Sequence, residues 1–142
     1  MGTSSNISKA QKGLQVPATF MIVFLVIQYA LGMVTNLFVQ FPDTSQAGPL
    51  WEAARSQFPS AAHIVVGTLL LIGAVVFTIR AAGKDNRPWL ASALGGLVGI
   101  IVAYISGVIF TTLQSDVYSL VMALGFIAAV VAYGWGLLAV KR

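Results

Sequence analysis

Four long stretches without a charged residue constrain the fold of this chain more than any other feature. Their limits are Lys12 and Asp43, Arg55 and Arg80, Arg87 and Asp116, and Asp116 and Lys141. Each stretch contains about 20 or more mostly apolar residues, enough for a helix to cross the hydrocarbon core of a bilayer, which is about 30 Å thick. The sequence therefore predicts an all-α membrane protein in which four transmembrane helices form an antiparallel bundle.

The predicted helices cover residues 16–41, 61–82, 88–112 and 117–140 of a single domain that spans residues 1–142. Pro88 opens the third helix at a first-turn position, where its missing N–H costs no hydrogen bond. Between the first two helices, residues 42–60 form the longest predicted outer loop. In this loop, apolar residues recur at helical spacing and indicate a short amphipathic helix on the membrane surface: Leu50, Trp51, Ala54 and Phe58. The alternative is a loop that Trp51 anchors at the interface.

Composition supports lipid as the solvent of this chain. Only 8% of the residues are charged and 58% are hydrophobic, whereas about a quarter of the residues of a soluble domain are charged. The net charge of +4 does not indicate nucleic-acid binding, because the basic residues gather at the helix ends and not along one face. The absence of cysteine excludes disulfides, thiolate metal sites and a thiol nucleophile.

The distribution of Lys and Arg predicts the orientation of the bundle. One side carries Lys9, Lys12, Arg80, Lys84, Arg87, Lys141 and Arg142, and the other carries Asp43, Glu52, Asp116 and Arg55. Because basic loops stay on the cytoplasmic side, both termini are expected in the cytoplasm. We therefore expect a multi-pass protein of the cell membrane whose 42–60 loop lies outside.

Small residues recur every four positions in the third and fourth predicted helices. The rows are Ala91, Gly95, Gly99, Ala103 and Gly107, and Ala128, Ala132 and Gly136. In lipid, such rows let helix backbones approach closely. They predict tight packing within the bundle, or alternatively a homodimer, docking on a larger membrane complex, or a groove for a flat ligand.

The polar residues of the predicted spans favour binding over catalysis. The membrane core of the spans contains no Asp, Glu, Lys or Arg, so that no acid–base pair, nucleophilic triad or phosphate loop can be assembled. His63 is the only histidine, and its neutral imidazole is a good axial ligand for haem iron. Gly67, one turn later, would leave room for the edge of a porphyrin between facing helices. The alternative is a helix-end histidine bonded to the loop or to a lipid headgroup.

Several segments resemble one half of the haem A synthase family. They are Ile27-Gln28-Tyr29-Ala30-Leu31-Gly32, Phe41-Pro42-Asp43, Ala62-His63-Ile64-Val65-Val66-Gly67 and Ala103-Tyr104-Ile105-Ser106-Gly107. The resemblance implies a four-helix half that holds haem near the outer face, between histidines of its second and fourth helices. His63 matches the first of these histidines.

The chain departs from the family pattern at three places. The fourth helix reads Leu120-Val121-Met122-Ala123 where the second histidine is expected, residues 57–62 contain no carboxylate, and the cysteine pair is missing. Met122 can replace the second ligand through its thioether, or two chains can each present His63 to one haem. The alternative for Met122 is core packing.

These observations predict a haem-binding or respiratory-chain accessory protein. Haem is the expected cofactor, with His63 on the iron and Met122, Gly67 and Gln28 as further cofactor-binding residues. A cofactor-free structural or assembly subunit, docking through its small-residue helix faces, is the alternative. A half-size haem A synthase-like enzyme acting as an oligomer is a third reading.

Overall fold

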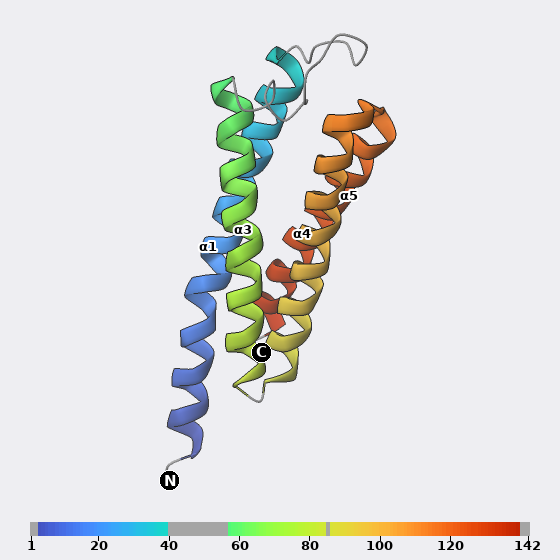
Figure 1. Cartoon of the computed structure of the whole chain (residues 1–142). Helices are drawn as coiled ribbons and strands as arrows, with labels where there is room; N and C mark the ends of the chain where they lie inside the picture. Colours follow the sequence, from blue (N-terminus) through green and yellow to red (C-terminus); the bar gives the residue numbers. More distant parts are fainter. Residues whose placement is uncertain (1–2, 40–56, 85, 140–142) are drawn as a thin grey trace.

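The computed structural model describes residues 3–39, 57–84 and 86–139. In these ranges the chain forms four α-helices and no strand (Figure 1): α1 (Thr3–Phe38), α3 (Phe58–Ala82), α4 (Arg87–Leu113) and α5 (Asp116–Ala139). We call the end of the bundle that holds Phe38, Phe58 and Asp116 the outer end, because the charge distribution predicts it to lie outside. The predicted all-α four-helix bundle is confirmed.

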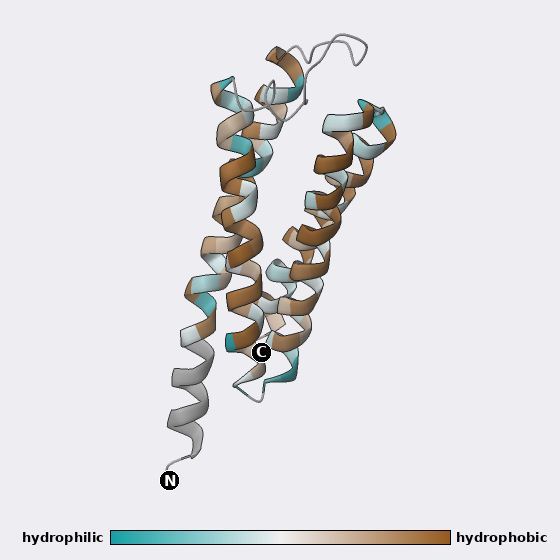
Figure 2. Cartoon of the chain, in the orientation of Figure 1, coloured by the Kyte–Doolittle hydropathy of each residue, from teal (hydrophilic) through white to brown (hydrophobic). Residues whose placement is uncertain are grey.

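Each of these helices contains a segment long and apolar enough to cross a membrane, namely residues 13–38, 58–82, 87–113 and 116–139. Large hydrophobic side chains such as Phe20, Val65, Val98 and Leu124 point outward from all four helices and are more than 45% exposed. Apolar residues run along the whole length of the bundle (Figure 2). A helix that is hydrophobic on its outer face needs lipid around it, and the chain is therefore a small multi-pass membrane protein.

The boundaries of α1 differ from the prediction. This helix begins at Thr3, 13 residues before the predicted start, and ends at Phe38. Hydropathy locates the apolar span and not the helix itself, which continues beyond the span because its backbone hydrogen bonds are internal. Pro17 lies inside α1, where it removes one backbone hydrogen bond. The other described boundaries lie within three residues of the prediction.

The predicted surface helix falls largely outside the described residues, since residues 40–56 are not among them. The assignment of Phe58 to it is wrong, because Phe58 and Pro59 form the first turn of α3. Proline is tolerated there because the first N–H groups of a helix have no partner within it.

The ends of α4 follow from two polar residues. The side chain of Asn86 accepts a hydrogen bond from the backbone N–H of Trp89 (3.3 Å), and Pro88 lies in the first turn as predicted. At the other end, Gln114 adopts a left-handed conformation (φ 49°) and its N–H donates to the carbonyl of Phe110 (2.8 Å). This conformation ends α4 and leads directly into α5, so that the two helices form an antiparallel hairpin.

The α1 and α3 helices pack through matching heptad positions. Positions alternately four and three apart are buried or half-buried in both helices: Leu14, Ala18, Met21, Leu25, Gln28, Gly32 and Thr35 in α1, and Ser60, His63, Gly67, Leu70, Ala74, Phe77 and Ala81 in α3. A repeat of 3.5 residues keeps one seam facing the partner helix. The inner half of this seam is apolar, whereas the outer half consists of polar residues and glycines.

The α4 and α5 helices meet through their small residues. Gly99 is so close to α5 that an added Cβ would lie 2.7 Å from the carbonyl oxygen of Gly125 and 2.8 Å from the nitrogen of Ala129. The Ser92 hydroxyl donates to the carbonyl of Ala132 (2.8 Å) across the same interface. The prediction of tight packing within the bundle is confirmed at Gly99, which is buried against α5.

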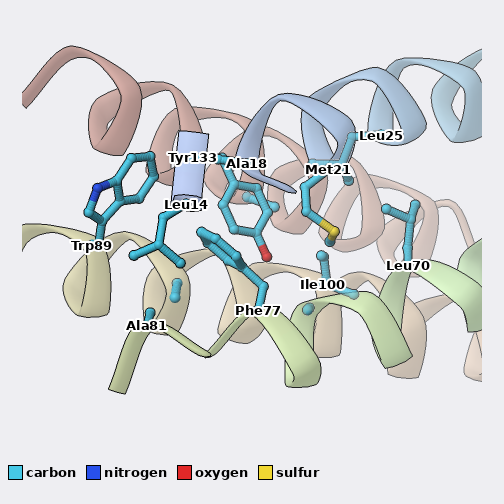
Figure 3. Packing of buried hydrophobic residues seen from close by; sticks show 13 residues of the cluster. Leu14, Ala18, Met21, Leu25, Leu70, Phe77, Ala81, Trp89, Ile100 and Tyr133 are labelled. Atoms are coloured by element: carbon cyan, nitrogen blue, oxygen red, sulfur yellow. The ribbon is translucent and has the colours of Figure 1, made fainter. Parts of the chain in front are cut away.

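An aromatic cluster closes the inner half of the bundle (Figure 3). Phe77 meets Trp89 and Tyr133 edge to face, with ring centroids 6.0 and 5.7 Å apart, and all three side chains are buried. The Thr78 hydroxyl, which donates to the carbonyl of Ala74 in its own helix (2.8 Å), also lies 3.3 Å from the carbonyl of Ala93 in α4. The inner half is therefore a filled core, and the two helix pairs α1/α3 and α4/α5 are held together there.

Candidate functional site

A partly open cavity of about 350 Å³ lies in the outer half of the bundle, between the two helix pairs. All four helices contribute to its lining, and most of that lining is apolar. Ligand pockets in proteins range from about 300 to 1,000 Å³. The cavity brings together all four predicted cofactor-binding residues, namely Gln28, His63, Gly67 and Met122.

Gln28 of α1 and His63 of α3 form the polar centre of one wall. The amide nitrogen of Gln28 lies 3.0 Å from the backbone oxygen of His63, to which it donates, and 3.3 Å from the ring atom Nε2. Hydrogen bonds between side chains and backbone of neighbouring helices are a common means of joining helices in lipid. This contact fixes the imidazole against α1.

Four buried polar atoms of the lining have no hydrogen-bond partner among the described residues: Gln28 Oε1, Thr35 Oγ1, Ser60 Oγ and His63 Nδ1. Thr35 and Ser60 occupy corresponding positions of the α1–α3 seam, about one turn outward from Gly32 and His63. Leaving a buried polar atom unpaired costs about 1–3 kcal/mol, and such atoms are rare in native proteins. Four of the six unpaired buried polar atoms of the described residues thus gather at this cavity, which indicates a place where a polar group binds.

Two glycines let the polar residues approach one another. An added Cβ on Gly67 would lie 2.9 Å from the amide nitrogen of Gln28, and one on Gly32 would lie 3.0 Å from Cε1 of His63. Gly67 therefore makes room for the Gln28 amide, where the sequence predicted room for a porphyrin edge. Gly32 provides a flat surface for the imidazole ring.

The opposite side of the cavity belongs to α4 and α5. The sulfur of Met122 lies next to Gly107, 3.4 Å from the place of an added Cβ. The rings of Tyr29 and Phe126 stack with centroids 5.2 Å apart and join α1 to α5. His63 and Met122 thus line the same cavity from different helix pairs.

The described residues contain no group of three or more His, Asp or Glu side chains that could hold a metal ion. Haem needs only one or two axial ligands, so its binding stays a prediction. An axial imidazole must present an unprotonated ring nitrogen to the iron. Nε2 of His63 is next to the Gln28 amide and Nδ1 is buried over Gly32.

The sequence reasoning missed Gly32, Thr35 and Ser60 as site residues. The signal that could have found them is the heptad spacing of α1 and α3, which places them on the same seam as Gln28 and His63. The sequence contains this spacing. However, most residues that share it are apolar and indicate core packing, so the spacing alone does not distinguish site residues from core residues.

No protein-family model, curated protein or solved structure matches this chain. The resemblance to the haem A synthase family therefore stays a prediction based on the segments quoted above.

Proposed function

We propose that this membrane protein binds a small, largely apolar molecule in the cavity between its two helix pairs. The observation that carries the proposal is the set of four unpaired polar atoms, on Gln28, Thr35, Ser60 and His63, within an otherwise mostly apolar lining. The core of a bilayer contains no water to satisfy such atoms. An apolar cavity with a few converging polar groups is the usual composition of a ligand site.

The lining supports binding more than catalysis. No Asp, Glu, Lys or Arg is among the residues that line the cavity. His63 would have to act without a carboxylate or an amine to orient or assist it. A binding or carrier role needs only the polar contacts that the cavity offers.

Haem is a second candidate for the ligand, favoured by the placement of His63 and Met122 on the same cavity. Four-helix bundles hold cofactors between facing helices, and a histidine with a methionine is a known axial pair. Coordination would require His63 to turn one ring nitrogen away from α1 and into the cavity. A respiratory-chain accessory role would follow from haem binding, whereas a half-size haem A synthase rests on the resemblance alone.

The test is native mass spectrometry of the protein purified in mild detergent, together with its absorption spectrum in the oxidised and reduced states. We expect a non-covalent adduct on the wild type, lost at least tenfold in Ala123→Phe, which fills the cavity. The matched control Ala91→Phe, on the exposed face of α4, keeps the adduct. A porphyrin band that sharpens and shifts on reduction would identify the adduct as haem.

The proposal is wrong if the wild type carries no adduct and if neither haem nor a total membrane lipid extract raises its unfolding temperature. A ligand that binds the folded state stabilises it by mass action. Adducts of equal abundance on the wild type and on Ala123→Phe would contradict the location of the site.

A further inference from the structure

The orientation of the Gln28 amide follows from its contact with the backbone of α3. A carbonyl oxygen only accepts hydrogen bonds, so the amide atom 3.0 Å from the oxygen of His63 is the nitrogen. An amide oxygen at that place would set two acceptors against each other. Gly67 permits the contact, because any side chain there would meet the amide nitrogen.

This orientation determines which ring nitrogen of His63 carries the proton. The Gln28 amide nitrogen has two hydrogens, one of which points to the backbone oxygen and the other to Nε2, 3.3 Å away. Nε2 must therefore accept, and a neutral imidazole has only one N–H. The proton is on Nδ1.

The N–H at Nδ1 is a buried donor without an acceptor among the described residues. It lies along the edge of the ring that faces Gly32, 3.4 Å from the place that a Cβ would take. His63, which lines the cavity, therefore carries an unpaired donor and not a lone pair at this nitrogen, and a ligand reaches the donor when the ring moves aside from Gly32. A ligand that satisfies it needs an acceptor oxygen.

The other parts of the cavity suit a flat ring. The stacked rings of Tyr29 and Phe126 lie on its lining, and the hydroxyl of Tyr104, 3.4 Å from the Thr68 hydroxyl, is a further polar group there. A volume of about 350 Å³ is near the lower limit for ligand pockets and fits a head group of one or two rings. The cavity is partly open, so that an apolar tail can extend into the lipid.

We infer that the ligand of this cavity is a lipid-soluble molecule of quinone type, whose ring carbonyl accepts a hydrogen bond from Nδ1–H of His63 above Gly32. This inference rests on the proposed function and names its ligand class. It differs from the haem candidate in the role of His63, which here acts as a hydrogen-bond donor and coordinates no metal.

The first test measures the tautomer directly. His63 is the only histidine, so protein labelled with ¹⁵N-histidine gives two ring-nitrogen signals that need no assignment by mutation. We expect a protonated Nδ1 and an unprotonated Nε2 in the purified wild type. A protonated Nε2 would overturn the inference.

The second test compares two probes, decylubiquinone and decylbenzene, which share a six-membered ring and a decyl tail, whereas only decylubiquinone has acceptor oxygens on its ring. Decylubiquinone is expected to shift the Nδ1–H signal and to bind at least fivefold more tightly than decylbenzene, as expected for about one additional hydrogen bond. Gly32→Ala, which presses on the ring of His63, should weaken decylubiquinone binding at least fivefold. Gly73→Ala is the matched control, because its Cβ would meet Met21 of α1 at 3.2 Å, between the same two helices but outside the cavity.

The outcomes separate the inference from the proposed function. Equal binding of both probes, with no change at Nδ1, would overturn the quinone-type ligand and leave a cavity that binds apolar molecules. Failure of both probes to bind would overturn the inference, while the adduct measured by mass spectrometry would still decide the proposed function. Equal loss of binding in Gly32→Ala and Gly73→Ala would exclude a specific contact at Gly32.

Discussion

Gln28 and Gly67 act together at the scale of single residues. The glutamine amide reaches the backbone of α3 only because Gly67 has no side chain, and it then holds the ring of His63. Each residue alone is unremarkable in an apolar helix. Together they form a polar site within one helical turn of the α1–α3 seam. Its donor is His63 Nδ1–H and its acceptor is Gln28 Oε1.

Replacing Gln28 by leucine is expected to destabilise the protein by about 1–2 kcal/mol. The change removes the bond to the His63 backbone and leaves Nε2 buried without a partner, and interhelical hydrogen bonds in membranes contribute about 0.6–1.7 kcal/mol each. Titration with SDS, followed by circular dichroism, measures the loss. Gln15→Leu is the control, since the backbone oxygen of Gln15 accepts from Thr19 and its side chain has no hydrogen bond among the described residues. Equal effects of the two changes would show that the Gln28 amide does not stabilise the fold.

At the scale of helices, the two pairs use different packing. The α4–α5 hairpin relies on close approach of backbones at glycines, whereas α1 and α3 interlock larger side chains at heptad positions. Close backbone approach leaves no free volume. The heptad seam becomes looser and more polar in its outer half, and this is where the cavity lies.

Gly99→Ala is expected to destabilise the bundle by about 1–3 kcal/mol, the usual cost of overpacking. Its Cβ would lie 2.7 Å from the Gly125 oxygen, so the backbones of α4 and α5 must separate. Gly134→Ala is a matched control in α5, because its Cβ would meet nothing within 4 Å. The same SDS titration compares the two variants. A loss for Gly99→Ala no larger than that for Gly134→Ala would contradict the close α4–α5 contact.

At the scale of the whole molecule, the bundle is filled at one end and hollow near the other. The cluster of Phe77, Trp89 and Tyr133 closes the inner half, and the cavity occupies the outer half. The distribution of Lys and Arg predicts that the filled end faces the cytoplasm. The proposed ligand would accordingly bind within the outer leaflet.

Single-cysteine labelling tests this orientation, and the absence of native cysteine makes each variant unambiguous. We expect Ser115→Cys, between α4 and α5, to react with a membrane-impermeant maleimide added to intact cells. Ala82→Cys, at the end of α3, should react only after the membrane is opened. The reverse pattern would place the termini and the filled end outside.

The four spans are determined by the sequence itself, because hydropathy and charge are properties of consecutive residues and need no partner. The position of Pro88 in the first turn of α4 is also predictable from sequence, because the first N–H groups of a helix need no partner within it. The start of α1 is not, since the helix runs beyond the apolar residues that locate its span.

The site depends on tertiary structure. The sequence identifies His63 and Gln28 as polar residues in apolar spans and Met122 as a candidate ligand, but it does not place them on one cavity. Gly32, Thr35 and Ser60 acquire a role only when α1 and α3 pack in one antiparallel register, which sets Gly32 against the ring of His63. The tautomer of His63 is likewise decided by an amide 35 positions away. Local composition fixes which segments enter the membrane, whereas contacts between distant helices decide which hydrogen bonds are satisfied and where a ligand must supply the rest.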